Sequence, residues 1–344
     1  MANKVTISEI AQDCSVSPAT VSLVLNNKPG ISDETRARVW EAARNLGYLS
    51  PATNRRARPL KTIGMVVKTE PGLLPPANPF YSQVIAGVAD ACQGMGVNLL
   101  FAMLPVDRNN HPINVPPLME NSELDGLLMV GTFVDQTIHT ILGQCNPPIV
   151  LVDGYSDTES YDVVVSDNFG AAYQAVEYLI KNGHRYIGLV GSEEICYPSL
   201  QERRNGYLRA LKANEISQNY LADFNINRSQ GEEETIKLLT QNPQITAVFC
   251  VNDNVALGAL RAAKKLGRSV PGDLSIMGYD DTYLATSISP NLSTMRVDTR
   301  VMGRAAVHLL ALRMEKPDAV RSTFMIHPEL VVRESTTILS QPVN

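Results

Sequence analysis

Two short stretches near the amino terminus decide the first part of the fold: Thr6-Ile7-Ser8-Glu9-Ile10-Ala11 and Ser17-Pro18-Ala19-Thr20-Val21-Ser22-Leu23-Val24-Leu25-Asn26. The first opens with a capping box, in which Thr6 accepts from a free backbone N–H and Glu9 reaches back. The second opens with Ser17 as N-cap and a proline at the first helical position. Apolar residues follow each start at helical spacing, so the pattern predicts two short helices separated by a tight turn.

A third helix is predicted to begin at Ser32 and to stop near Gly47. Two short helices with a supporting third make the helix-turn-helix arrangement, whose second helix enters the major groove of DNA with its first residues toward the base edges. On that helix Val21, Val24 and Leu25 are expected to be buried. The opposite face then presents Pro18, Ala19, Ser22, Leu23 and Asn26. Periodicity alone also allows a three-helix unit with no role in DNA binding.

Length and composition describe a globular protein of two or three domains, since the chain has 344 residues of which 44% are hydrophobic. No apolar stretch is long enough to span a membrane, and Met1–Ile10 lacks the apolar run of a signal peptide, which predicts a cytoplasmic protein. The five cysteines lie far apart and are odd in number, which favours reduced thiols over disulfides. No metal-ligand spacing is present, so we expect neither a metal site nor a cofactor.

The net charge of −5 conceals an asymmetry between the two ends of the chain. Residues 1–61 carry nine Lys or Arg and five Asp or Glu, which gives +4 and leaves −9 for the remainder. Within residues 36–61 the basic residues outnumber the acidic ones by seven to one. A basic end on an acidic body indicates a polyanion contact confined to the amino terminus.

From Thr62 onward, apolar strand-like runs alternate with helical stretches, which predicts βαβ units and parallel sheets covered by helices. The expected strands are Ile63–Val67, Val97–Met103, Gly126–Val130, Ile149–Val152, Ile187–Val190, Ala247–Val251 and Ser275–Met277. The expected helices lie near 80–95, 169–182, 200–214, 230–241, 254–266 and 300–314. Because Thr62–Val67 is echoed by Tyr186–Gly191, we expect two similar doubly wound halves.

Polar side chains cluster where the predicted strands end, and ligands of doubly wound sheets bind beyond these ends, here between the halves. They include Asp153, Asn252-Asp253 and Asp280-Asp281, with Arg203 and the aromatic pair Phe80-Tyr81 at helix starts. Carboxylates, an amide and an Arg fork can hydrogen-bond adjacent hydroxyls, while an aromatic ring covers an apolar ring face. This set predicts a sugar or another small polar effector. For Asn252, Asp253, Asp280 and Asp281, helix capping is the alternative, and a structural ion pair is the alternative for Arg203.

The amino-terminal motifs, from Val5-Thr6-Ile7-Ser8-Glu9-Ile10-Ala11 through Val16–Asn26 to Gly47-Tyr48, resemble the headpiece of the lactose-repressor (LacI) family. The resemblance implies that Pro18, Ala19 and Leu23 read bases. Leu23 stands where the family often has Arg, so thymine methyl contacts replace a guanine reader. The phosphate contacts implied by the resemblance, which position the headpiece without reading sequence, are Thr6, Ser17, Thr20, Ser22 and Asn26.

In the family, the segment after the headpiece is a hinge helix that wedges a Leu into the minor groove. Counting from Tyr48 without gaps puts Ala57 at the wedge position, whereas matching Asn54–Leu60 to the family pattern puts Leu60 there. The basic residues Arg55, Arg56 and Arg58 are expected to supply minor-groove or phosphate contacts. A flexible basic linker is the alternative.

The large domain resembles the same family in Asn78–Tyr81, Gly183–Gly188, Cys250–Asp253 and Gly278–Asp281. The resemblance implies a core like that of the periplasmic sugar-binding proteins (type I). It also implies that the effector contacts include Tyr81, beside Phe80, and Asp153, Arg203, Asn252 and Asp280. The predicted organisation is a headpiece at 1–48, a hinge at 49–61 and an effector-binding and dimerisation domain at 62–340. Its N-subdomain would span 62–162 and 293–322, and its C-subdomain 163–292 and 323–340.

These observations predict a transcriptional regulator, most commonly a repressor in this family, whose affinity for a double-stranded and palindromic operator is set by the effector. Without a terminal leucine heptad, a homodimer is favoured over a tetramer. No catalytic motif is present, so an enzyme is not expected. Two alternatives are a small-molecule-binding protein of the periplasmic type and an architectural DNA-binding dimer without an effector.

Overall fold

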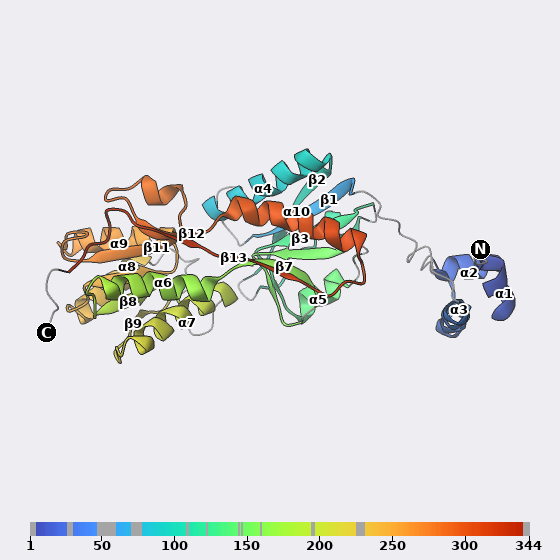
Figure 1. Cartoon of the computed structure of the whole chain (residues 1–344), viewed down its shortest axis with the longest axis horizontal. Coiled ribbons are helices and arrows are strands. Elements are labelled where there is room, and N and C mark those ends of the chain that lie inside the picture. The colour runs from blue at the N-terminus through green and yellow to red at the C-terminus, as the bar shows by residue number, and fades with distance from the viewer. Residues whose placement is uncertain are drawn as a thin grey trace. The chain divides into compact units, whose positions relative to one another are not determined.

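The computed structural model describes residues 5–25, 30–46, 60–69, 78–107, 110–121, 123–143, 145, 147–158, 160–193, 197–224 and 231–339. The chain divides into two compact units, residues 1–59 and residues 60–344 (Figure 1). No helix in these described ranges is long and apolar enough to cross a lipid bilayer.

In the described residues of the first unit, three helices surround a small apolar core: α1 (Ile7–Asp13), α2 (Pro18–Leu25) and α3 (Asp33–Asn45). The predicted capping box is confirmed, since Thr6 accepts from the backbone of Glu9 and the Glu9 carboxylate accepts from Thr6 N at 2.6 Å. The predicted N-cap of α2 is confirmed too, because the Ser17 hydroxyl accepts from the Thr20 N–H at 3.0 Å. The expected stop at Gly47 lies outside the described residues.

Ser15, in the turn between α1 and α2, has a φ of +54°, a left-handed conformation that costs a residue with a Cβ about 1 kcal/mol. Ser15→Gly is therefore expected to stabilise the headpiece by about 0.5 kcal/mol, after the greater backbone entropy lost by glycine is subtracted. Hydrogen exchange of α1 and α2 amides in the full chain measures this. As a control, Ser17→Gly should not stabilise, since it removes the hydroxyl that caps α2. Faster exchange in Ser15→Gly would contradict the expectation.

The second unit contains two six-stranded sheets and their covering helices. The first sheet is parallel throughout, with the order β13-β7-β5-β3-β1-β2. The second has the order β14-β12-β11-β10-β8-β9, and only β14 is antiparallel to its neighbour. The two similar doubly wound halves predicted from the sequence are therefore confirmed.

The strands of the first sheet are β1 (Thr62–Thr69), β2 (Asn98–Pro105), β3 (Gly126–Val130), β5 (Ile149–Val152), β7 (Asp162–Ser166) and β13 (Thr323–Ile326). Those of the second are β8 (Ile187–Val190), β9 (Tyr220–Ala222), β10 (Ala247–Cys250), β11 (Ser275–Asp280), β12 (Ser293–Arg296) and β14 (Glu329–Val331). A two-residue pair, β4 (Phe133–Val134) and β6 (Tyr155–Ser156), lies beside the first sheet's strand ends.

The helices are α4 (Pro79–Met95), α5 (Gln136–Leu142), α6 (Asn168–Lys181), α7 (Pro198–Ala213), α8 (Gly231–Gln241), α9 (Asp253–Lys265) and α10 (Thr299–Glu315), with single 3₁₀ turns at Pro117–Glu120 and Tyr283–Thr286. Helices α4 and α10 pack side by side against the first sheet, and the pairs α6 with α7 and α8 with α9 cover the second (Figure 1). The predicted helices near 80–95, 169–182, 200–214, 230–241, 254–266 and 300–314 are all present.

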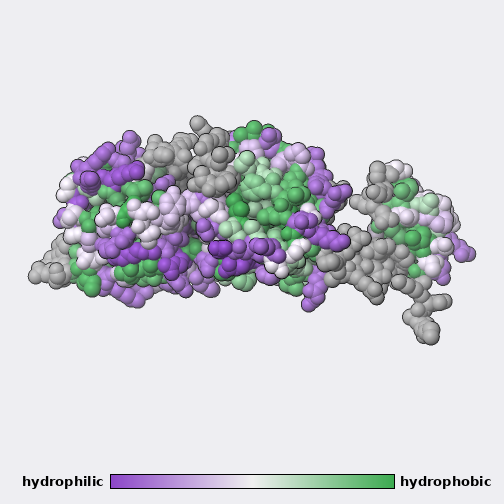
Figure 2. Space-filling model, turned by 90° about the horizontal axis from the view of Figure 1, so that it is seen from above, coloured by the Kyte–Doolittle hydropathy of each residue, from purple (hydrophilic) through white to green (hydrophobic). Residues whose placement is uncertain are grey.

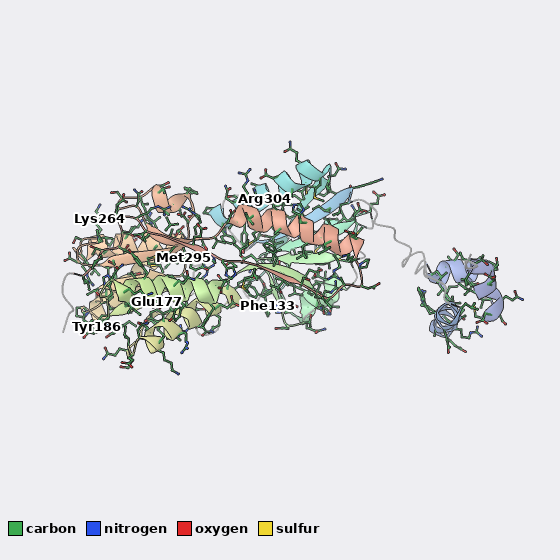
Figure 3. The ribbon with its side chains drawn as sticks, viewed as in Figure 1. Phe133, Glu177, Tyr186, Lys264, Met295 and Arg304 are labelled. Carbon is green, nitrogen blue, oxygen red and sulfur yellow. The ribbon has the colours of Figure 1, made fainter. Side chains whose placement is uncertain are left out.

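The chain crosses from one sheet to the other three times. The position of each crossing follows from the sheet to which the neighbouring strands belong. β7 and β13 belong to the first sheet and β12 to the second, so the crossings follow Ser166, Arg296 and Ile326. The subdomain limits placed from sequence at 163, 293 and 323 lie a few residues earlier, on the wrong side of these short strands. These three crossings bring strand ends and helix starts from both halves to one boundary. In Figure 3, Met295 marks β12 in one half and Phe133 marks β4 in the other.

Candidate functional site

The described part of the headpiece exposes one face of α2. Pro18 and Ala19 are exposed and Leu23 is 40% exposed, while Val21 and Val24 are fully buried. The buried side of α2 packs against α1 and α3, so its first turn and Leu23 are free to contact a partner. These are the residues expected to read bases. Asn26, Arg55, Arg56, Ala57 and Arg58, expected to contact DNA as well, lie outside the described residues.

Three residues expected to contact phosphates form hydrogen bonds at the starts of α1 and α2. Thr6 donates its hydroxyl to Glu9 Oε2 at 2.9 Å, and Ser17 and Thr20 share a hydroxyl contact of 2.8 Å. The bonds from the backbone and side chain of Thr6 lower the pKa of Glu9, which keeps the capping carboxylate ionised. Capping aligns the first N–H groups of each helix, and such N–H groups bind phosphate oxygens well.

In the core, Tyr81 and Asp153 come together although 72 residues separate them. Tyr81 lies in the first turn of α4, and its hydroxyl donates to Asp153 Oδ2 at 3.0 Å. Phe80 packs edge-on against the Tyr81 ring, with a distance of 5.3 Å between the ring centroids. Asp153 follows β5, is only 7% exposed and has a φ of +46°. A buried carboxylate on a strained backbone position is typical of a functional site.

Arg203 on α7 is the central cation of this cluster, and it is 6% exposed. Its Nε donates to Asn168 Oδ1 at 2.8 Å, and its Nη1 donates to the backbone oxygen of Val251. The guanidinium stacks on the Tyr279 ring, 3.7 Å from the centroid. Its Nη2 lies 3.4 Å from Asp280 Oδ1, so the ion pair suggested as the alternative for Arg203 is present.

Asp280 is the last residue of β11, and one of its carboxylate oxygens has no hydrogen-bond donor among the described residues. Its Oδ1 is buried and accepts no hydrogen bond from the residues that the structure describes, and its φ is +101°. Burial raises the pKa of Asp280 to about 8, and the lowering effect of Arg203 does not offset it. Burial likewise raises the pKa of Asp153 to about 6, against the opposing effect of Arg203. Asp280 Oδ1 therefore has only the 3.4 Å contact with Arg203, and a ligand hydroxyl or amine could donate a hydrogen bond to it.

Asn252 caps a helix, as the capping alternative anticipated, whereas Asp253 bonds to Thr282 and Thr294 and caps no helix in the described residues. The Asn252 side chain accepts from the Val255 N–H at 2.8 Å and caps α9. Asp253 is 1% exposed, and its carboxylate accepts three hydrogen bonds. The donors are the N–H of Thr282 at 2.6 Å, the hydroxyl of Thr282 at 3.0 Å and the hydroxyl of Thr294 at 2.7 Å. Asp281 pairs with Arg296 and Arg333, each at 2.7 Å, and fixes the end of β11 beside Asp280.

Sequence reasoning missed the residues that join the two halves at this cluster. Tyr197, just before α7, donates to the backbone oxygen of Asp153 at 3.1 Å, and Lys68 at the end of β1 lies over its ring. Tyr155 donates to Glu202 Oε2 at 3.2 Å and accepts from Asn168 Nδ2 at 3.1 Å. In the sequence, only their positions could have indicated these residues. Tyr155 follows Asp153 by two residues, and Tyr197 precedes Pro198 at a helix start.

This arrangement can hold a small polar molecule but offers no catalytic group aimed at a reacting atom. The carboxylates and tyrosines bond to one another or to Arg203, and no cluster of metal-ligating side chains occurs in the described ranges. A helix-turn-helix unit joined to a two-lobed α/β core with a buried polar cluster at the lobe boundary defines a class: DNA-binding proteins with a ligand-responsive core.

Comparison with known proteins identifies the family. Residues 6–50 match the bacterial regulatory proteins of the lacI family, and residues 176–336 match the periplasmic-binding-protein-like domain. The ribose operon repressor of Haemophilus influenzae is 34% identical over 335 residues, which cover 96% of this chain and 98% of that protein. The transcriptional repressor PurR of Aliivibrio salmonicida is 31% identical over 337 residues, with 96% and 98% covered.

Among solved structures, the complex of the transcriptional regulator CelR with cellobiose has a TM-score of 0.68 at 28% identity, covering 96% of this chain and 100% of that one. The chain belongs to the lacI family of bacterial regulatory proteins. The fold and family predicted from the sequence are thus confirmed, and the chain is a DNA-binding transcriptional regulator, not an enzyme.

Proposed function

We propose that this chain is a cytoplasmic repressor that binds a palindromic operator as a homodimer and changes its operator affinity when a small polar effector occupies the core. One observation carries the effector half of the proposal: the buried Asp280 Oδ1, 3.4 Å from Arg203 Nη2, accepts no hydrogen bond from the described residues. The exposed first turn of α2 supports the operator half.

The proposed effector site consists of Phe80, Tyr81, Asp153, Arg203, Asn252 and Asp280, extended by Tyr155, Tyr197 and Glu202. A sugar fits the chemistry, since its hydroxyls donate to Asp280 and Asp153 and accept from Arg203, while Phe80 covers an apolar ring face. Structures of family members with cellobiose and with ribose support this class of ligand. We therefore choose ribose and cellobiose as the first probes.

The proposed DNA interface consists of Pro18, Ala19 and Leu23 as base contacts, with Thr6, Ser17, Thr20, Ser22 and Asn26 on phosphates and Arg55, Arg56, Ala57 and Arg58 in the linker. Three apolar base contacts, with no Arg among them, favour thymine methyl groups over guanine. We retain the division into a headpiece at 1–48, a linker at 49–61 and a core from 62 as part of this proposal.

Dimerisation is proposed through the edge strand β2 and the end of α4. Met95, Leu100, Phe101 and Met103 are each about 40% exposed there, and Figure 2 shows hydrophobic surface gathered over this half of the core. An open strand edge with large apolar side chains favours burial against a second copy.

Deleting residues 1–59 separates the two activities. The truncated core is expected to keep its affinity for the probe sugar within about twofold, because every described residue of the proposed site lies beyond residue 59. Binding to a duplex selected from a random pool by the full chain should fall to the level of a scrambled duplex, a loss of about 1,000-fold or more. Calorimetry and fluorescence anisotropy measure the two affinities.

A core that still prefers the selected duplex would contradict the operator half of the proposal. If no member of the sugar panel releases heat with the full chain, the architectural alternative replaces the effector half. Loss of selective binding without loss of sugar binding is the result that distinguishes the proposal from a plain ligand-binding protein.

A further inference from the structure

The core begins with a tightly fixed segment at the point where the linker joins it. Leu60 is only 8% exposed and packs in the main hydrophobic cluster. The backbone of Lys61 bonds in both directions: its N–H donates to Asp125 Oδ2 at 2.8 Å, and its carbonyl accepts from Asn98 N at 2.7 Å. Buried in this way, Leu60 cannot also enter a minor groove unless it leaves the core, which argues against its role as the wedge.

Asp125 holds this segment with a single carboxylate oxygen. Asp125 Oδ2 accepts from the N–H of Lys61 at 2.8 Å and from the N–H of Thr62 at 3.0 Å, while Asp125 N donates to Thr62 O at 2.9 Å. Three hydrogen bonds thus join the start of β1 to the residue that precedes β3. Bonds from backbone N–H groups to a carboxylate are stronger than bonds between neutral groups.

The two strands joined by Asp125 both end at the proposed effector site. β1 runs eight residues, about 25 Å, from Thr62 to the region where Lys68 lies over Tyr197. β3 runs beside it in parallel register and is followed by Gly131, where an added Cβ would lie 2.5 Å from the Tyr81 hydroxyl. Each strand therefore has one end at the linker and the other at a residue of the polar cluster.

We propose that Asp125 is a positioning residue that fixes the linker to the core, so that operator affinity depends on the two N–H bonds that its side-chain oxygen accepts. The inference rests on the proposed function, because it needs an operator to measure. With Asp125 in place, β1 and β3 move together at the linker end, and a displacement imposed at their other ends, beside the polar cluster, reaches Lys61 as one rigid shift. Without it, the backbone of residues 60–62 loses its fixed direction, and two headpieces are no longer held for paired half-sites.

Asp125→Ala in the full chain tests this proposal, using the duplex that the wild-type chain selects from a random pool. Affinity for this duplex should fall about tenfold or more, within the usual range of coupling between sites. Affinity for a scrambled duplex should change less than twofold, since the phosphate contacts remain. Asp125→Asn should stay within about threefold of wild type, because an amide oxygen can accept both N–H bonds.

Asp135→Ala is the matched control for loss of stability. Asp135 is also a carboxylate in the first half, and it caps α5 by accepting from the Ile138 N–H at 2.9 Å, away from the linker. Its removal should lower the melting temperature about as much as Asp125→Ala but leave selective affinity within twofold of wild type.

Two outcomes would overturn the inference: selective affinity of Asp125→Ala within twofold of wild type, or an equal loss in Asp135→Ala. Both leave the proposed function intact, because the wild-type chain still selects a duplex. A wild-type chain that selects no sequence would instead contradict the proposed function itself.

Discussion

Arg203→Ala is expected to lower the free energy of unfolding of the core by about 3–5 kcal/mol and to weaken binding of the probe sugar at least tenfold. The substitution removes the guanidinium that donates to Asn168 and Val251 and forms an ion pair with Asp280. It leaves the buried acceptors of Asn168 and Val251 without a donor and the buried Asp153 carboxylate without the charge of Arg203, and both losses are costly. Thermal and urea unfolding, with calorimetry for the sugar, measure both losses.

The loss of stability in Arg203→Ala should depend on pH, and the pKa of Asp280 determines the direction of this dependence. Its folded-state pKa is raised to about 8 from an ordinary 3.8, so the folded state holds a proton that the unfolded state has released between these values. Stability from this group is present at low pH and is lost as the pH rises toward 8. Removing Arg203 raises the cost of ionising Asp280 further, so the variant should be more destabilised at pH 8 than at pH 5.

Arg204→Ala is the matched control, since Arg204 is the next residue on α7 and is also paired. Its Nη1 bonds to Ser192 and lies 2.6 Å from Asp223, away from the cluster. It should keep sugar binding within about twofold and lose less stability, because Asp223 is exposed to solvent. An Arg203→Ala chain as stable at pH 8 as wild type, or with unchanged sugar affinity, would contradict the role assigned to Arg203.

Sequence predicts the headpiece well because its signals are local. The capping box of Thr6 and Glu9 and the Ser17-Pro18 start each involve residues three or fewer positions apart, and the structure contains both. The alternating strands and helices of the core were predicted for a similar reason, since β1, β3 and β10 are continuous apolar runs buried on both faces.

The short strands near the crossings gave weaker signals. β12 (Ser293–Arg296) and β13 (Thr323–Ile326) carry polar residues and have only four residues each, too few for a period to be recognised. Because each of these strands directly precedes a change of sheet, leaving it out of the predicted strands moved the subdomain limit to its start. β7 contains Val163-Val164-Val165, an apolar run that could have been recognised as a strand.

The polar cluster was predicted in part. Tyr81, Asp153, Arg203 and Asp280 stand at strand ends or helix starts, where topology brings them together, and the structure places them in one network. Tyr155, Tyr197 and Glu202 come from loops and a helix side whose approach depends on how the two halves pack. No pattern within either half encodes that packing.

The contact between α4 and α10 also depends on tertiary packing, and a substitution at this contact should strongly lower the stability of the core. Gly87→Ala is expected to destabilise the core by about 3 kcal/mol, at the upper end for overpacking. A Cβ at Gly87 would fall on the carbonyl oxygen of Arg300, and one at Gly303 would fall on that of Val84, so the two helix backbones touch. Figure 1 shows these helices side by side, and Arg304 is labelled on α10 in Figure 3. Neither backbone can move without shifting the sheet beneath it.

Gly94→Ala, on the same helix, is expected to do the opposite. No atom of the described residues lies within 4 Å of a Cβ at Gly94, so the change adds helix propensity without a clash and should stabilise by about 0.5–1 kcal/mol. Urea unfolding of both variants measures the difference. Because α4 carries Phe80 and Tyr81 at its start, any displacement in Gly87→Ala should also weaken sugar binding, whereas Gly94→Ala should leave it unchanged. Equal stability of the two variants would mean that α4 and α10 are not in backbone contact, and the proposed site would lose the rigid support of its aromatic residues.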